Sequence, residues 1–237
     1  MDEAVHLLER VFVAVEPSAR VEATIGRCEE AGVPTVAVTD HALDALADAR
    51  TPQGIVGVAV WPRATLAAVG GASLLVVLDR VADPGNLGTA VRSADAAGAD
   101  AVVLTSGSVD PTNAKAVRAS AGSVFHLPVV DDVDPDDLAA HCRQAGVHMV
   151  AATADASRHY DEVSWTRPTA IVFGNEAHGL STTMAHHVVA SVSVPIRRPQ
   201  RPGYRGHAES LNLATTVAVV VHEIARQRAA PDRTWDP

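Results

Sequence analysis

The fold of this chain is decided at Leu74-Leu75-Val76-Val77-Leu78 and at the segment that follows it, Asp83-Pro84-Gly85-Asn86-Leu87-Gly88-Thr89-Ala90-Val91-Arg92-Ser93-Ala94-Asp95-Ala96-Ala97-Gly98. The unbroken Leu/Val run predicts a strand that is buried on both faces. Pro84-Gly85 predicts a turn, Asn86 a helix cap, and Gly88 a point where backbone approaches closely, with the helix over 87–97. A buried strand that leads into a capped helix is typical of a parallel sheet covered by helices.

The same alternation continues along the chain. Further strands are predicted over 101–104, 124–130, 149–152, 170–173 and 192–194, with helices over 112–121, 135–145 and 209–228. This order predicts an α/β fold with a parallel sheet that helices cover on both faces. A ligand site is then expected beyond the carboxyl ends of the strands.

The first 60 residues form a smaller unit of the same kind. Strands are predicted over 10–16, 33–38 and 54–60, with helices over 19–31 and 41–49 between them. Pro62, Gly70 and Gly71 interrupt a weakly apolar stretch, which predicts a linker. We therefore expect a small α/β domain over 1–68 and a larger domain over 72–237.

Composition excludes several classes of protein. The chain has 237 residues, 47% hydrophobic and 20% charged, without the roughly 18 uninterrupted apolar residues of a membrane helix, and its acidic N-terminus does not resemble a secretory signal. We expect a cytoplasmic protein with no membrane partner. Cys28 and Cys142 stand in no metal-binding pattern, so we expect two buried thiols and no metal. The net charge of −9 requires any nucleic-acid contact to be made by local positive charge.

Two further segments place polar groups at predicted strand ends. Ile171-Val172-Phe173-Gly174-Asn175-Glu176-Ala177-His178-Gly179-Leu180-Ser181 runs from a strand into an acidic loop, where the Glu176 carboxylate needs partners if it is desolvated. Val194-Pro195-Ile196 is followed later by Ser210-Leu211-Asn212, where Ser210 and Asn212 can cap the last helix or contact a ligand. No Gly-x-Gly-x-x-Gly fingerprint is present, which disfavours a nicotinamide enzyme.

In this order the three segments closely resemble the signature motifs of the SpoU (TrmH-like) family of the SPOUT methyltransferase superfamily, over about residues 74–228. Thr51-Pro52-Gln53-Gly54-Ile55-Val56 more loosely resembles the end of the small ribosomal-protein-like substrate-binding domain that often precedes that catalytic domain. The resemblance implies a C-terminal trefoil knot, S-adenosylmethionine as methyl donor without a metal, and a homodimer.

The resemblance also implies roles for individual residues. It assigns the cofactor pocket to strand-end backbone, and it assigns Arg92 to the ribose hydroxyl. Since arginine stays protonated, we interpret Arg92 as a clamp on the RNA phosphate and the developing alkoxide rather than as a base. The other polar motif residues would orient Arg92, the cofactor or the ribose. The predicted cofactor residues are Thr153, Ala154, Gly174, Asn175, Val194, Ile196 and Leu211, and the predicted catalytic residues are Arg92, Asn86, Glu176, Ser210 and Asn212.

The third motif departs from the family pattern because a long basic loop separates Pro195 from Ser210. Cationic side chains around an aromatic ring suit phosphate contact and base stacking, so we expect RNA to bind there. The alternative is a solvated loop. The residues concerned are Arg197, Arg198, Arg201, Tyr204 and Arg205.

We therefore expect an RNA 2′-O-ribose methyltransferase that acts on structured RNA, with ribosomal RNA favoured over tRNA by analogy. Three alternatives remain open from the sequence. These are a tRNA 2′-O-methyltransferase, a non-catalytic RNA-binding or assembly protein of the same fold, and a methyltransferase for another acceptor.

Overall fold

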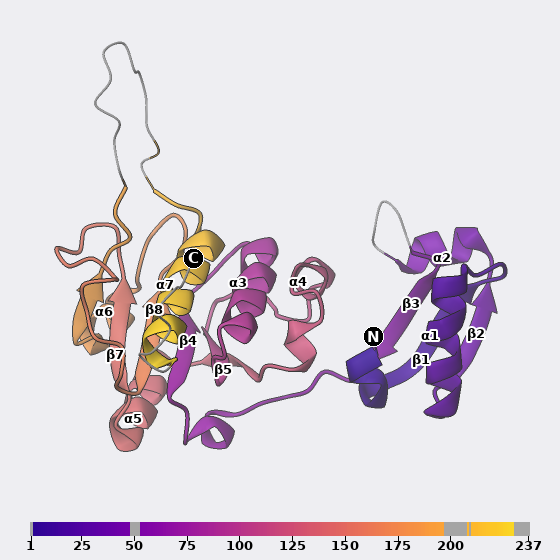
Figure 1. The fold of residues 1–237 in the computed structure, drawn as a ribbon, viewed down its shortest axis with the longest axis horizontal. Helices are drawn as coiled ribbons and strands as arrows, with labels where there is room; N and C mark the ends of the chain where they lie inside the picture. The colour runs from indigo at the N-terminus through magenta and orange to yellow at the C-terminus, as the bar shows by residue number, and fades with distance from the viewer. Residues whose placement is uncertain (1, 48–52, 197–207, 209, 230–237) are drawn as a thin grey trace, which may run out of the picture. The chain divides into compact units, whose positions relative to one another are not determined.

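A computed structural model describes residues 2–47, 53–196, 208 and 210–229 of the chain. The chain divides into two compact units, residues 1–62 and 63–237, which are drawn in Figure 1. None of the described helices combines the length and the apolar composition needed to cross a bilayer. Cys28 and Cys142 are buried free thiols, as expected.

The first unit is a three-stranded sheet with two helices. Its elements are η1 (Asp2–Leu7), β1 (Leu8–Ala14), α1 (Ala19–Glu30), β2 (Thr35–Val38), α2 (Asp40–Leu46) and β3 (Ile55–Ala59). The strand order is β2-β1-β3, with β2 parallel and β3 antiparallel to β1. Val11 and Val13 of β1 pack on Val21 and Cys28 of α1. The predicted alternation of strands and helices is therefore present.

The second unit is built on a six-stranded sheet. Its elements are η2 (Leu66–Val69), β4 (Leu74–Leu78), α3 (Pro84–Ala96), β5 (Ala101–Thr105), α4 (Ala114–Ala119), η3 (Ser123–Phe125), β6 (Val129–Val133), α5 (Pro135–Ala145), β7 (His148–Ala152), β8 (Thr169–Phe173), α6 (Thr182–His187), β9 (Ala190–Val192) and α7 (Leu213–Arg228). The strand order is β6-β5-β4-β8-β7-β9, and every neighbouring pair is parallel. The predicted parallel α/β sheet is thus confirmed.

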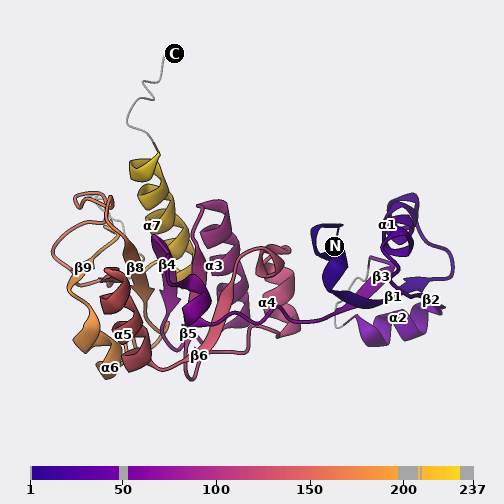
Figure 2. The ribbon, with the colours of Figure 1, turned by 90° about the horizontal axis from the view of Figure 1, so that it is seen from below.

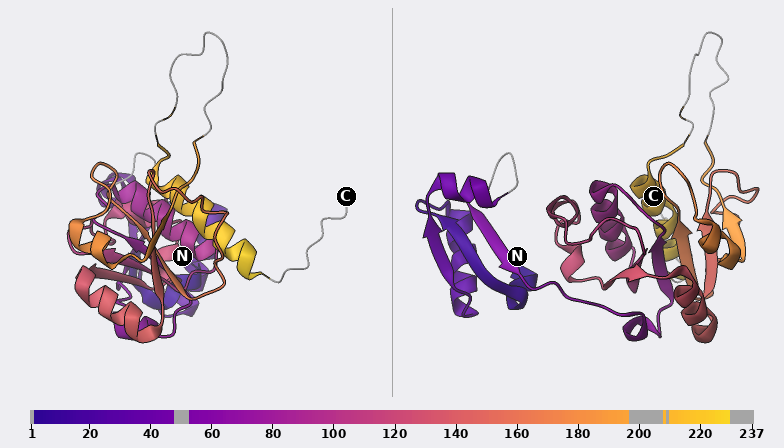
Figure 3. Two further views of the ribbon diagram at one scale, coloured as in Figure 1. Left: turned by 90° about the vertical axis from the view of Figure 1, so that its left-hand side faces the viewer. Right: turned by 180° about the vertical axis from the view of Figure 1, so that it is seen from behind.

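Helices cover both faces of this sheet. Leu75 and Val77 of β4 lie in one core with Leu138 of α5 and Met184 of α6. Since alternate residues of a strand point to opposite faces, the intervening Val76 points to the other side. Figure 2 shows α3 and α7 along that side, with α5 and α6 opposite, and the views in Figure 3 agree. The central strands are therefore apolar throughout because each has helices above and below it.

The division between the units falls at residues 62 and 63, before the predicted linker ends. Val69 and Ala72 are buried in the core of the second unit, and Leu66 packs against it. The segment that sequence alone presents as a linker therefore belongs to the second unit, because its few apolar side chains have a core to pack on.

The predicted cap of α3 was wrong. The helix begins at Pro84, and the cap is Asp83, whose Oδ1 accepts a hydrogen bond from the backbone N–H of Asn86 at 2.8 Å. Proline suits the first helical position because its missing N–H has no partner to lose there. The side chain of Asn86 is therefore free for other contacts.

Two other predicted boundaries shift. The strand expected over 124–130 is β6, Val129–Val133, and the residues before it form the turn η3. The last helix starts at Leu213 rather than at 209, because Asn212 caps it by accepting hydrogen bonds from the N–H groups of Ala214 and Thr215.

Candidate functional site

A cavity of about 1020 Å³ lies at the carboxyl edge of the sheet, where the sequence predicted a ligand site. It is lined by the residues that follow β7 and β8, by those that follow β9, and by those that lead into α7. The strands β8, β7 and β9 are neighbours in the sheet, so their ends open on the same place.

Backbone pairing fixes the segments around the cavity. The N–H of Thr153 donates to the carbonyl of Val192 at 2.9 Å. Ser193 donates to the carbonyl of Arg158 at 2.8 Å and accepts from the N–H of Tyr160 at 3.0 Å. The first part of the loop after β7 is therefore hydrogen-bonded to the end of β9 and to Ser193.

The loop after β8 folds back on itself, and this requires glycine at its start. The N–H groups of Asn175 and Gly179 each donate to the other's carbonyl at 2.9 Å. A Cβ on Gly174 would lie 2.3 Å from the carbonyl carbon of Gly179 and 2.5 Å from the nitrogen of Leu180. No side chain fits there without moving backbone, so Gly174 is what allows the loop to reach the cavity.

Asn175 holds this loop in place through its side chain. Its Oδ1 accepts from the N–H groups of Ala177 at 2.9 Å and His178 at 3.1 Å, and its Nδ2 donates to the carbonyl of Arg80 at 2.7 Å. Asn175 lines the cavity as predicted, but its amide group is engaged by the protein.

Asp79 is a second anchor of the loop, and sequence reasoning missed it. This residue is fully buried directly after β4. Its carboxylate accepts hydrogen bonds from the Thr105 hydroxyl at 2.8 Å, and from the backbone N–H and hydroxyl of Ser181 at 2.6 and 3.3 Å. A carboxylate that follows a buried strand needs such partners. The same rule that drew attention to Glu176 could have identified Asp79.

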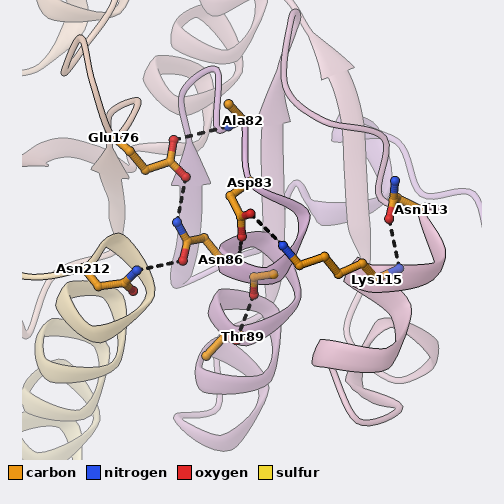
Figure 4. Close-up of polar contacts among 9 residues, drawn as sticks. Ala82, Asp83, Asn86, Thr89, Asn113, Lys115, Glu176 and Asn212 are labelled. Atoms are coloured by element: carbon orange, nitrogen blue, oxygen red, sulfur yellow. Dashed lines mark hydrogen bonds and ion pairs between the residues drawn. The ribbon is translucent and has the colours of Figure 1, made fainter. Parts of the chain in front are cut away.

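Asn86 joins the three sequence motifs (Figure 4). Its Nδ2 donates to Oε1 of Glu176 at 2.9 Å, and its Oδ1 accepts from Nδ2 of Asn212 at 2.9 Å. The second oxygen of Glu176 accepts from the N–H of Ala82 at 3.3 Å. Residues from α3, the β8 loop and the start of α7 thus form one polar cluster at the cavity, which we call the Asn86 cluster.

Charges in and beside the cluster are held in their ionised forms. Desolvation raises the pKa of Glu176, but hydrogen bonds from Asn86 and from backbone amides including that of Ala82 outweigh it, so this pKa lies below its ordinary value. The pKa of Asp83 is lowered mainly by a hydrogen bond from Lys115, whose Nζ lies 2.8 Å from Oδ2. Both carboxylates are therefore ionised at neutral pH.

The structure brings together most of the predicted site residues. Ser210 lies at the cavity, is exposed, and makes no hydrogen bond within the described residues. The predicted positions that line the cavity are Asn86, Thr153, Ala154, Gly174, Asn175, Glu176, Val194, Ile196, Ser210, Leu211 and Asn212. The predicted RNA-binding residues Arg197, Arg198, Arg201, Tyr204 and Arg205 lie outside the described residues.

Arg92 is the exception. It is exposed on α3, forms no hydrogen bond or ion pair within the described part of the chain, and is absent from the residues named around the cavity. It lies six positions after Asn86, which places the two side chains about 120° apart around the helix axis. Within one copy of the chain, the described structure does not join Arg92 to the Asn86 cluster.

The cavity has the size and the mixed lining of a small-molecule site. Ligand pockets commonly enclose roughly 300–1,000 Å³ and combine apolar walls with a few polar groups. Here the side chains of Leu180, Val194 and Ile196 supply walls. The backbone N–H groups of Leu180, Ile196 and Leu211 have no partner among the described residues, and all three residues line the cavity. No cluster of metal-ligating side chains occurs in the described ranges.

Comparison with known proteins agrees with this geometry. The SpoU rRNA Methylase family matches residues 73–222. The 23S rRNA (guanosine(2553)-2′-O)-methyltransferase RlmP of Bacillus subtilis is 33% identical over 229 residues, covering 94% of this chain and 86% of that protein.

Two solved structures with bound AdoMet share the fold. The SpoU methyltransferase AviRb from Streptomyces viridochromogenes has a TM-score of 0.78 and 26% identity, over 93% of this chain and 83% of that one. The AdoMet-bound rRNA methyltransferase from Sinorhizobium meliloti has a TM-score of 0.79 and 29% identity, over 95% and 82%. Together with the strand-end cavity and the Asn86 cluster, these matches establish that the chain belongs to the SpoU rRNA Methylase family of SPOUT methyltransferases.

Proposed function

We propose that this protein is an S-adenosylmethionine-dependent methyltransferase that modifies a ribose 2′-hydroxyl of large-subunit ribosomal RNA. Its membership of the SpoU family and its similarity over nearly the whole chain to a protein named a 23S rRNA 2′-O-methyltransferase support this reaction and this substrate class. Because ribosomal RNA is made and assembled in the cytoplasm of bacteria, we propose that location too.

The Asn86 cluster is the observation that carries the proposal. S-adenosylmethionine supplies a methyl group on a sulfur that is already positively charged, so the protein needs to position the reactants more than to activate the donor. Asn86, Glu176 and Asn212 lie at the cavity and fix one another by hydrogen bonds of 2.9 Å. Such a pre-arranged polar group suits a ribose, whose hydroxyls both donate and accept.

We assign the donor pocket to the backbone around the cavity. The walls at Thr153, Ala154, Gly174, Asn175, Val194, Ile196 and Leu211 would hold the nucleoside by apolar contact. The amides of Ile196 and Leu211, which have no partner among the described residues, would donate to it. Ser210 lies at the same cavity, its hydroxyl makes no hydrogen bond with a described residue, and it would contact the ribose or the donor.

Arg92 would bind the RNA phosphate next to the target ribose and would stabilise the negative charge that develops on the attacking oxygen. Its guanidinium stays protonated, so the proton of the hydroxyl goes to another acceptor, for which we propose that phosphate. Since Arg92 lies outside the cavity of its own chain, we propose that the protein is a homodimer in which a second copy presents Arg92 to this site.

Mixing two inactive variants tests this arrangement. Arg92→Ala keeps the cavity, and Leu211→Trp blocks it with a ring while keeping Arg92. If Arg92 acts across the dimer, mixed dimers contain one complete site and activity returns after subunit exchange. If Arg92 serves its own chain, the mixture stays inactive.

We also propose the trefoil knot of the family for the C-terminal part of this chain. The loop that follows β7 is hydrogen-bonded to the end of β9 through Thr153 and to Ser193 through Arg158 and Tyr160. The membership of the chain in the SpoU family supports this proposal.

Two further parts of the chain are proposed to bind RNA. The first, residues 1–62, has the α/β composition expected of the small ribosomal-protein-like domain. The second is the segment with Arg197, Arg198, Arg201, Tyr204 and Arg205. Changing the four arginines to Ser should reduce both the RNA affinity and its dependence on salt, and an unchanged salt dependence would remove this segment from the RNA-binding surface.

The reaction itself is tested with tritiated S-adenosylmethionine and total RNA from a strain that lacks the gene. Digestion should release labelled 2′-O-methyl nucleosides from large-subunit RNA, and Arg92→Ala should abolish the label while Arg143→Ala, an exposed arginine on α5, does not. Label in tRNA would support the alternative substrate. Cofactor binding without labelled ribose would indicate another acceptor, and no cofactor binding would indicate a non-catalytic RNA-binding protein.

A further inference from the structure

Arg80 has a backbone conformation that L-residues seldom adopt. It follows β4 and Asp79 at the carboxyl edge of the sheet, and its φ is +57°. Only glycine occupies this left-handed region without steric cost, so an arginine here persists only where its surroundings impose the conformation.

Both backbone groups of Arg80 are fixed by side chains. Its N–H donates to the hydroxyl of Thr105 at 3.0 Å, and its carbonyl accepts from Nδ2 of Asn175 at 2.7 Å. The Thr105 hydroxyl donates in turn to the buried carboxylate of Asp79. The same contacts that hold the β8 loop at the cavity therefore also fix the point from which the Arg80 side chain leaves the chain.

The Arg80 guanidinium has no anion within the described structure. The residue is exposed, and its side chain forms no hydrogen bond or ion pair with another described residue. Three carboxylates along this edge already have partners: Asp79 binds Ser181 and Thr105, Asp83 binds Lys115, and Glu176 binds Asn86. In a chain with a net charge of −9, Arg80 is thus a permanent positive charge at the carboxyl edge of the sheet, next to Asn175, that the described residues leave unneutralised.

We propose that Arg80 binds a backbone phosphate of the RNA substrate beside the methylated ribose. Asn175 holds the Arg80 carbonyl, and the next residue, Glu176, is bound to Asn86 and to Ala82, two residues after Arg80. The Arg80 side chain lies near Gly107, on the β5 side of β4. A strand whose ribose lies at the Asn86 cluster and which continues toward β5 would then pass Arg80. This inference rests on the proposed function, since it assumes an RNA substrate at that site.

Three substitutions separate charge from backbone strain. Arg80→Gly removes the charge and relieves the strain of the left-handed conformation. Arg80→Asn removes the charge and introduces a residue that tolerates the left-handed conformation, and Arg80→Lys keeps the charge. Asp132→Gly is the matched control, because Asp132 is an exposed non-glycine residue with φ +54° on the edge strand β6.

The experiment measures binding of large-subunit ribosomal RNA, from a strain lacking the gene, over a range of salt concentrations. Arg80→Gly and Arg80→Asn should each weaken binding several-fold and make the slope of log K against log salt shallower by about 0.7–0.9, the value for one lost phosphate contact. Arg80→Lys and Asp132→Gly should bind as the wild type does. The KM for RNA should rise in Arg80→Gly and Arg80→Asn, while their cofactor affinity stays unchanged. The melting temperature should be unchanged in the other variants and unchanged or higher in the two glycine variants.

Other results would overturn the assignment. Wild-type affinity and salt slope in Arg80→Gly would mean that the guanidinium touches no phosphate. A fall in melting temperature or cofactor affinity in Arg80→Gly that accounts for its weaker RNA binding would make the role of Arg80 structural. If the wild-type protein neither binds nor methylates this RNA, the proposed function itself fails, and that result is visible before any variant is compared.

Discussion

Replacing Asn86 by Asp changes one atom group and should break the Asn86 cluster. The Nδ2 of Asn86 donates to Oε1 of Glu176 at 2.9 Å, while its Oδ1 accepts from Asn212. In Asn86→Asp the acceptor for Asn212 remains, but the donor to Glu176 becomes a second carboxylate oxygen. The substitution therefore keeps shape and one hydrogen bond and turns the other contact into a repulsion.

The size of the effect follows from distance and exposure. Two carboxylates about 4 Å apart repel by about 1 kcal/mol in water and about 4 kcal/mol at the effective dielectric of a protein surface. Glu176 is exposed, so the lower value applies. The lost hydrogen bond adds about 1 kcal/mol. We expect Asn86→Asp to destabilise the second unit by about 2 kcal/mol, which is roughly thirtyfold in an equilibrium constant.

A second substitution should reverse this loss. In the double variant Asn86→Asp, Glu176→Gln, the new glutamine amide donates to the new aspartate, so the pair re-forms with donor and acceptor exchanged. Because Glu176 is itself proposed to act in the site, we would measure urea unfolding and S-adenosylmethionine affinity rather than turnover. The double variant should be more stable than Asn86→Asp alone. If the two losses simply add, the repulsion between these positions does not exist and our account of the cluster is refuted.

Three further predictions concern packing, pH and catalysis. Gly88→Ala should destabilise the second unit by about 2 kcal/mol despite a gain in helix propensity, because the new Cβ would lie 2.2 Å from the carbonyl oxygen of Ala116. Gly26→Ala in α1 should instead stabilise the first unit by about 0.5–1 kcal/mol, because a Cβ there would have nothing within 4 Å. Urea unfolding checks both predictions. Lys115 lowers the pKa of Asp83 from its ordinary value of 3.8. This ion pair therefore stabilises the fold at pH values above about 3.8, and its contribution is lost as the pH falls through the lowered pKa. On acid titration, Lys115→Met should lose less free energy of unfolding than the wild type does. Arg92→Ala should lower methyl transfer at least about a hundredfold and leave cofactor affinity, measured by calorimetry, unchanged.

The sheet and most of the cavity could be predicted from sequence because their signals are local. Runs such as Leu74–Leu78 and Thr169–Phe173 are apolar apart from Thr169, and this indicates a strand between two layers of helices; every residue of both strands is buried. Gly88 and Gly174 were expected to allow close approach or to line the site, and each would place a Cβ within 2.3 Å of backbone. The polar motif residues then followed from their place at strand ends.

What sequence could not supply depends on contacts between distant segments. Asp83, Pro84 and Asn86 all favour a helix start, and only the structure shows that Asp83 is the cap, which frees Asn86. Asp79 has its partners in Thr105 and Ser181, which lie 26 and 102 residues away. Pattern reasoning assigns a residue to an element, but it does not say which distant groups satisfy it.

The Asn86 cluster explains why the site must form as one piece. Asn212 uses its Oδ1 to cap α7 and its Nδ2 to bind Asn86, which is 126 residues away. Asn86 uses Oδ1 for Asn212 and Nδ2 for Glu176, so each amide is occupied at both ends. An aspartate at either position keeps an acceptor and loses the donor, and a glutamine is one methylene too long for the same geometry. The start of α7, the start of α3 and the β8 loop are therefore fixed together, and a ligand that requires all three in place should stabilise the whole second unit on binding.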